Sequence, residues 1–219
     1  MELRPITKVA LGEMAEGKAM YLLETLKKTF EMMTGAGRPS HTSLEASVAP
    51  RTPHTTMFRD DGIIPNNPKL PFIHYLGAVA LPERGDPAAV FEELFERNGW
   101  GDSWRNGIYD YVHYHSGTHE VLGVARGHAR VRFGGNSGKV VDLRAGDVVV
   151  LPAGTGHQSL DASKDLLVIG AYPRNGKYDE CRGSRQEHER ALESIPKVPL
   201  PAKDPVYGAD GPLRDAWKG

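Results

Sequence analysis

Residues 107–127 read GIYDYVHYHSGTHEVLGVARG and residues 146–157 read GDVVVLPAGTGH, and these two stretches decide the fold. Both are short runs rich in β-branched and aromatic residues bounded by glycine, a pattern that favours strands separated by tight turns. Residues 148–151 are apolar without alternation, as in a strand that is buried on both faces. The two stretches therefore indicate a β-rich fold.

The same pattern continues around these stretches. Between about residues 108 and 172, strand-like segments follow one another with glycine turns at the spacing of a sandwich or barrel. We predict one barrel domain over residues 56–219, with its core at 108–172 and a C-terminal helix and tail. Residues 1–55 are predicted to be an N-terminal helical extension and linker, because apolar residues recur at helical steps over 13–33 and turn-forming residues follow.

Capping residues predict two peripheral helices. Asp86 is suited to cap a helix that starts at Pro87 and ends at Asn98-Gly99. Ser184 and Glu187 form the pattern of a capping box for a second helix, which runs up to Pro196. Residues 72–81 form an apolar stretch that suits a buried strand, and residues 99–107 are predicted to be a loop.

Four side chains in the two deciding stretches form a set of metal-binding type. His113 and His115 are two residues apart, so on a strand both imidazoles point to one face. A Ser-Gly-Thr bend then precedes Glu120, and a Pro-Ala-Gly turn precedes His157. Three imidazoles and a carboxylate suit Mn(II), Fe(II), Co(II), Ni(II), Cu(II) or Zn(II), and suit calcium or magnesium poorly. The alternative is three hydrogen-bonded core histidines, which a His-X-His pair alone would favour; the offsets of Glu120 and His157 favour one divalent transition metal.

Two further residues are candidates for a catalytic role. Tyr111 shares the alternation of His113 and His115, so it should face the barrel interior, where its hydroxyl is able to donate to a bound anion; plain packing is equally open. His119 is a candidate proton carrier or hydrogen-bond partner of a ligand. Strand alternation puts His119 opposite Glu120, which favours a structural role for it.

At these residues the sequence resembles the cupin superfamily, which has the RmlC-like jelly-roll fold. The first motif of that family is complete here: Gly, five residues, His-X-His, four residues, Glu, six residues, Gly. The second is Gly, five residues, Pro-X-Gly, two residues, His; it departs from the family only at Asp161, where a non-ligating Asn is usual. Residues 58–81, 98–127 and 178–211 also resemble the YjlB-type single-domain bacterial cupins. The resemblance implies a mainly β protein, a double-stranded β-helix (jelly-roll) barrel with a few peripheral helices and the metal inside its mouth.

The sequence predicts the fold in more detail than the function. Four protein ligands on an octahedral ion leave roughly two positions for a substrate or O2. We expect a metal-binding cupin that acts as an oxidoreductase of dioxygenase type on a small organic molecule. The alternatives are a metal-dependent lyase or isomerase and a non-catalytic small-ligand-binding cupin, so whether the chain is an enzyme stays open.

Composition excludes several other classes. The chain has 219 residues, a formal net charge of -1 and a single cysteine, Cys181, so no intrachain disulfide and no multi-thiolate zinc site is possible. Basic residues are scattered, which argues against a nucleic-acid partner. Residues 1–19 lack the apolar core of a secretory signal, and no apolar run is long enough to cross a bilayer. We expect a cytoplasmic protein with a small-molecule partner and no membrane partner, with a homodimer through exposed sheet edges as an open expectation.

Overall fold

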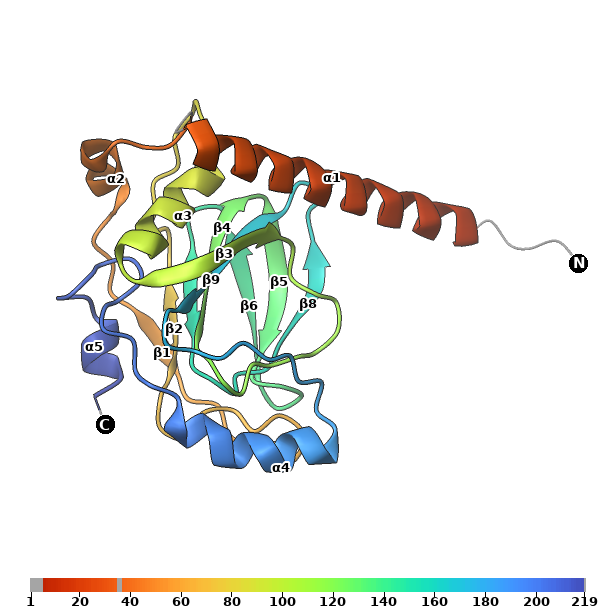
Figure 1. Cartoon of the computed structure of the whole chain (residues 1–219). Coiled ribbons are helices and arrows are strands. Elements are labelled where there is room, and N and C mark those ends of the chain that lie inside the picture. The colour runs from red at the N-terminus through yellow and green to blue at the C-terminus, as the bar shows by residue number, and fades with distance from the viewer. Residues whose placement is uncertain (1–5, 35–36, 219) are drawn as a thin grey trace, which may run out of the picture. The chain divides into compact units, whose positions relative to one another are not determined.

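The computed structural model describes residues 6–34 and 37–218, and it divides into two compact units at Arg38/Pro39 (Figure 1). The first unit contains α1 (Ile6–Thr34), which begins earlier than the helix predicted over 13–33. The second unit contains every strand of the described chain. Each unit is described by itself.

The division lies before the predicted boundary at 55/56. Residues 39–55 contain α2 (His41–Ser47) and most of β1 (His54–Thr56), where a linker was expected. Leu44 of α2 is buried in the core, and the main chain of Val48 forms a bridge with Val79. The turn-forming composition of this stretch hid both elements, because each is too short to show a period in the sequence.

Two antiparallel sheets form the body of the second unit (Figure 1). The six-stranded sheet has, in order, β1, β2 (Phe72–Tyr75), β7 (Val148–Leu151), β4 (Glu120–Arg126), β9 (Leu167–Pro173) and β3 (Trp100–Asn106). The three-stranded sheet has, in order, β6 (Lys139–Arg144), β5 (His128–Phe133) and β8 (His157–Ala162). The predicted mainly β class is therefore confirmed.

Alternating side chains of the six-stranded sheet enter two different cores. On β7, Val149 and Leu151 belong to the inner core, which they share with Val131 and Phe133 of the other sheet. Val148 and Val150 belong to the outer core, on the side of the helices. The strand is buried on both faces, as its unbroken apolar run predicted.

The outer core is covered by helix α3 (Pro87–Arg97) and by the C-terminal segment with α5 (Leu213–Ala216). Asp86 caps α3 and Pro87 opens it, as predicted. Helix α4 (Arg185–Ser194) begins with the predicted capping box of Ser184 and Glu187, and the 3-10 turn η1 (Ile195–Lys197) follows it.

Two predicted segments differ in the structure. Residues 100–106 form strand β3 rather than a loop, and they pair with β9 through a register shift between Gly101 and Trp104. That irregularity breaks the alternation by which a strand is recognised in a sequence. The apolar stretch 72–81 is a strand only over Phe72–Tyr75.

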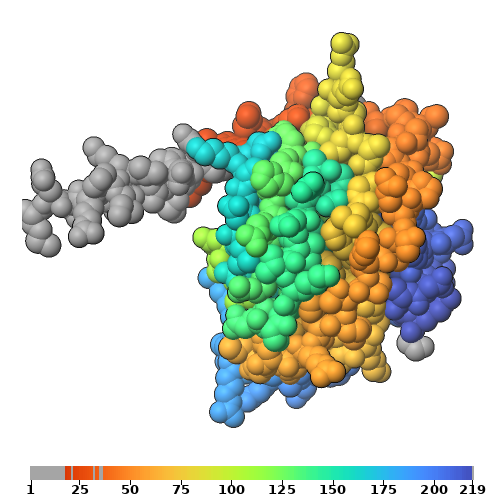
Figure 2. Space-filling model, turned by 180° about the vertical axis from the view of Figure 1, so that it is seen from behind, coloured from red at the N-terminus to blue at the C-terminus, as the bar shows by residue number. Residues whose placement is uncertain are grey.

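Aromatic side chains link the segment after β1 to the inner core. Seen from behind in Figure 2, this segment (orange) lies beside β5 and β6 (green). The Phe58 ring lies 5.8 Å from that of Phe72, which in turn lies 4.6 Å from that of Phe133. No helix in the described ranges is both long and apolar enough to span a bilayer.

Candidate metal centre

The backbones of His113 and His157 pair with each other, although 43 residues separate them in the sequence. The amide of His113 donates to the carbonyl of His157 at 3.2 Å, and the reverse bond is 2.9 Å long. Their rings lie 4.0 Å apart, and the His115 ring lies 5.5 Å from that of His113. One ring nitrogen from each of the three buried histidines lies within 4.8 Å of the other two.

Glu120 joins this cluster from the first position of β4. It has the alternation of Leu122 and Val124, whose side chains enter the inner core. The Oε2 atom of Glu120 lies 3.5 Å from Nε2 of His115 and 3.4 Å from Nε2 of His157. The structure therefore brings all four sequence-predicted ligands together.

Each histidine ring is oriented by a main-chain carbonyl. The Nδ1 atom of His113 lies 3.4 Å from the carbonyl oxygen of Tyr111, and that of His157 lies 3.2 Å from the carbonyl oxygen of Thr155. The Nδ1 atom of His115 makes a short contact with the carbonyl oxygen of Asp179. A carbonyl only accepts, so Nδ1 carries a proton in each ring, which leaves Nε2 as the nitrogen that is available to a metal.

The charges of the cluster are coupled. Burial opposes ionisation of Glu120, but the neighbouring imidazoles, His115 first, outweigh it and lower the pKa of this carboxyl group to about 2. Burial acts to lower the pKa of His115, yet the Glu120 carboxylate raises it overall. Burial, with repulsion from the other rings, lowers the pKa of His113, and it lowers that of His157 to about 3. Glu120 is therefore anionic and His157 neutral near pH 7.

The cluster fits a divalent ion in its donor chemistry. Within the described chain, Oε2 of Glu120 is buried and accepts no hydrogen bond of ordinary length. A buried carboxylate oxygen is costly to leave without a partner, and the Nε2 atoms of His115 and His157 lie 3.5 and 3.4 Å from it. Neutral imidazoles with one carboxylate form a ligand set for transition metals.

Tyr111, a predicted catalytic residue, lies beside the cluster. Its ring centroid is 5.6 Å from that of His113, and it stacks on Tyr109 at 4.8 Å. Its hydroxyl donates to Glu180 at 3.3 Å, and the Arg182 guanidinium lies 4.1 Å from the ring centroid. Burial and the nearby Glu180 charge raise the pKa of Tyr111. The Tyr111 hydroxyl is therefore protonated, and the Glu180 carboxylate already accepts its hydrogen bond.

His119, the other predicted catalytic residue, points to the opposite side of β4 from Glu120. Its Nδ1 atom accepts a hydrogen bond from the amide of Ala153 at 2.9 Å, and its ring lies 4.7 Å from that of Trp217. Burial lowers the pKa of His119 to about 4, so the ring is neutral near pH 7. His119 therefore ties the chain before β4 to the C-terminal segment, which is the structural role that strand alternation favoured over a catalytic one.

Three residues around the cluster escaped the sequence analysis. Tyr172 lies on the inner alternation of β9, and its hydroxyl accepts a hydrogen bond from the Trp104 indole at 2.9 Å. Burial and the Glu120 charge raise the pKa of Tyr172, so its hydroxyl stays protonated beside that carboxylate. The period-2 pattern of β9 could have identified Tyr172. Tyr178 and Asp179 have no such signal, because they follow the last strand.

Comparisons with known proteins agree with this geometry. Residues 106–168 match a family model described as Cupin domain. The curated "Uncharacterized protein YjlB" of Bacillus subtilis (strain 168) is 42% identical over 167 residues, which are 76% of this chain and 98% of that protein.

Solved structures are similar over shorter stretches. Oxalate decarboxylase of Bacillus subtilis is 23% identical and covers 36% of this chain and 22% of its own, with a TM-score of 0.30. Acireductone dioxygenase from Bacillus anthracis, with a cadmium ion in its active centre, is 18% identical and covers 44% of this chain and 68% of its own, with a TM-score of 0.31. Similarity at this level says nothing about the activity of this chain.

Proposed function

This chain belongs to the cupin superfamily, and on that premise we propose that it binds one divalent transition metal of the Mn, Fe, Co, Ni, Cu and Zn group. The proposed ligands are His113, His115, Glu120 and His157. The observation that carries the proposal is the convergence of three buried histidine rings beside a buried carboxylate oxygen that accepts no ordinary hydrogen bond in the described chain.

The finer proposal is an oxidoreductase of dioxygenase type that acts on a small organic molecule. A metal bound at this centre supplies Lewis acidity and, if it is redox-active, a site for O2 chemistry. Four protein ligands on an octahedral ion leave roughly two positions for reactants, which supports chemistry rather than a closed structural site.

The surrounding residues have roles that follow from their contacts. The Trp104 indole donates to the Tyr172 hydroxyl, and burial together with the Glu120 charge keeps that hydroxyl protonated. The Tyr172 ring also packs edge-on against His115 at 5.8 Å and keeps water from that side of the ring. The rings of Tyr111 and Tyr178 lie beside those of His113 and His115, where they are able to pack against a substrate.

The metal is tested first. Elemental analysis of the purified protein should give close to one transition metal per chain, and His157→Ala should lose it. The matched control is His128→Ala, an exposed histidine on β5, which should keep full occupancy. Full occupancy in His157→Ala would show that the ligand set is wrong.

The reaction class is tested next, with the protein reconstituted with Fe, Mn, Ni or Zn. Oxygen uptake with small acids, thiols or enediols supports the dioxygenase-type proposal. Turnover without oxygen and with redox-inert Zn(II) would instead assign a lyase or isomerase. A ligand whose affinity depends on the metal, with no turnover in any metal form, would assign a non-catalytic binding protein.

Three further properties belong to the proposal. A small-molecule partner follows from the enclosed position of the cluster, and a bacterial source is supported by the Bacillus subtilis relative. A cytoplasmic location is proposed from the sequence alone. A homodimer is proposed because β1, β3, β6 and β8 are edge strands, and light scattering on the purified chain measures it.

A further inference from the structure

A segment outside the barrel strands runs antiparallel to the chain that carries His115. Residues 177–182, called the strap here, follow the turn after β9. The amides and carbonyls of Tyr114 and Cys181 exchange two hydrogen bonds of 3.0 Å each. The amide of Lys177 donates to the carbonyl of Gly117 at 2.9 Å. The strap therefore forms a short two-stranded pairing over residues 114–117.

Gly117 allows this close approach. A Cβ atom at that position would lie 2.3 Å from the carbonyl oxygen of Lys177, far inside van der Waals contact. Any larger residue at position 117 would push the strap away from the His115 chain.

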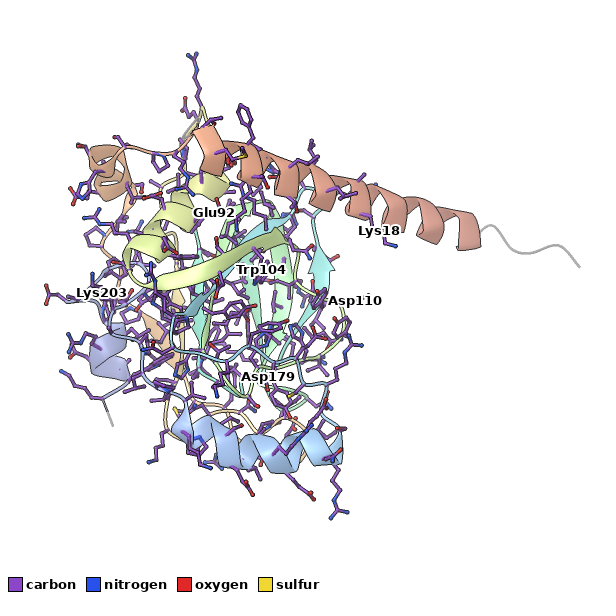
Figure 3. The ribbon with its side chains drawn as sticks, viewed as in Figure 1. Lys18, Glu92, Trp104, Asp110, Asp179 and Lys203 are labelled. Atoms are coloured by element: carbon purple, nitrogen blue, oxygen red, sulfur yellow. The ribbon has the colours of Figure 1, made fainter. Side chains whose placement is uncertain are left out.

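Asp179 clamps the turn after His115 through its carboxylate. Its Oδ1 atom accepts the amides of Ser116 at 2.8 Å and Gly117 at 3.1 Å. Its Oδ2 atom accepts the Ser116 hydroxyl at 2.6 Å. Its carbonyl oxygen accepts the Nδ1 proton of His115. One residue thus fixes both the backbone after His115 and the orientation of the His115 ring, and Figure 3 shows it at the end of the strands that faces α4.

The neighbours of Asp179 on the strap face the other way. Tyr178 places its ring 5.0 Å from the His115 ring, and Glu180 accepts the Tyr111 hydroxyl at 3.3 Å. Tyr178 and Glu180 therefore contact the His115 ring and the Tyr111 hydroxyl, while Asp179 and Cys181 contact the chain at residues 114–117.

We propose that the strap is part of the metal centre, with Asp179 as a positioning residue that holds His115 with its Nε2 atom toward Glu120 and His157. The inference rests on the proposed metal function and deepens it. A histidine ligand whose Nδ1–H lacks a fixed acceptor is free to rotate or change tautomer, so it binds the metal less tightly. The barrel motif alone would then be insufficient for a tight site.

Asp179→Ala is the test, because it removes the carboxylate that accepts the Ser116 and Gly117 amides, the Ser116 hydroxyl and the Cys181 thiol, and so holds the strap carbonyl in place. Two measurements are made, each against Asp142→Ala, which removes an exposed carboxylate on β6. The first is the ¹⁵N chemical shifts of the His115 ring in metal-free protein, recorded well above the pKa of His115 so that the ring is neutral and the shifts report its tautomer. The second is Co(II) affinity by competition with a chelator.

We expect the His115 ring of Asp179→Ala to lose its single Nδ1–H tautomer and the Co(II) affinity to fall about 10- to 100-fold. Asp142→Ala should match the wild type in both measurements. Asp179→Asn should recover much of both, because its amide oxygen still accepts the Ser116 and Gly117 amides.

If Asp179→Ala does not fold, Gly117→Ala displaces the strap from the other side and should give the same tautomer change. An unchanged His115 tautomer with wild-type Co(II) affinity in the folded variant would overturn the inference. Failure of the wild type itself to bind Co(II) would sink the proposed function, whereas the tautomer in metal-free protein would still decide whether Asp179 positions His115.

Discussion

At the scale of single residues, the adjacent residues His119 and Glu120, at the start of β4, have opposite roles. Glu120 enters the inner core with Leu122 and Val124, whereas His119 enters the outer core against Trp217. Burial affects both, but in different ways. Glu120 keeps its charge because imidazoles surround it, and His119 loses its charge because no carboxylate is among the groups that shift its pKa.

Metal binding should depend on pH mainly through His115. Its raised pKa favours an extra proton on His115 in the metal-free site, which the metal must displace. The pKa values of His113 and His157 are lowered, which favours neutral rings that have no proton to release. Affinity should be full well above the pKa of His115 and fall as the pH drops through it, with about one proton released per metal. Calorimetry in buffers of different ionisation enthalpy counts those protons, and a count near three would contradict this assignment.

His119→Ala should reduce stability without reducing metal content. The change leaves the buried Ala153 amide without its acceptor and opens a gap beside Trp217, a loss of about 2–4 kcal/mol. Urea unfolding followed by tryptophan fluorescence measures the loss, with the exposed His128→Ala as the control. Loss of metal with unchanged stability would restore a direct role for His119 at the centre.

At the scale of elements, a buried ion cluster joins α3 to β3. The guanidinium of Arg105 pairs with Asp86 at 2.7 Å and with Glu92 at 2.8 Å, and all three side chains are almost fully buried. Asp86 also caps α3. The same guanidinium therefore fixes the start of α3 and its second turn against β3, which holds that edge of the six-stranded sheet in position.

Arg105→Met should be strongly destabilising. It keeps most of the side-chain volume but leaves two carboxylates buried without their cation, at a cost of about 3–5 kcal/mol. Arg130→Met on β5 is the matched control: its 3.5 Å pair with Asp142 is solvent-exposed, and its loss should cost less than about 1 kcal/mol. Equal midpoints of denaturant unfolding for the two variants would contradict this account of the α3–β3 contact.

At the scale of the whole molecule, the division at Arg38/Pro39 places residues 39–56 in the same compact unit as the two sheets. Leu44 is buried in the outer core, and β1 pairs with β2 through His54, Thr55 and Thr56. The segment between 39 and 56 therefore belongs to the fold, although its sequence has the composition of a linker.

Two truncated chains distinguish a domain boundary at 38/39 from one at 55/56. A chain that starts at Pro39 should keep the thermal midpoint and metal content of the whole protein. A chain that starts at Met57 should lose about 3 kcal/mol or more, because Leu44 leaves a buried site and β2 loses a strand partner. Calorimetric melting of both chains is the measurement. Equal midpoints for the two would place the boundary at 55/56, as the sequence suggested.

The strand-rich core, the capped helices and the four residues of the candidate centre could all be predicted from the sequence. These features follow from local rules: two-residue alternation, turn and cap residues, and fixed spacings within one or two strands. Three contacts became visible only in the folded chain: the Asp179 carbonyl with His115, the Tyr172 ring with the His115 ring, and Arg105 with two buried carboxylates. Each of these contacts joins positions far apart in the chain through packing, and packing leaves no period in the sequence.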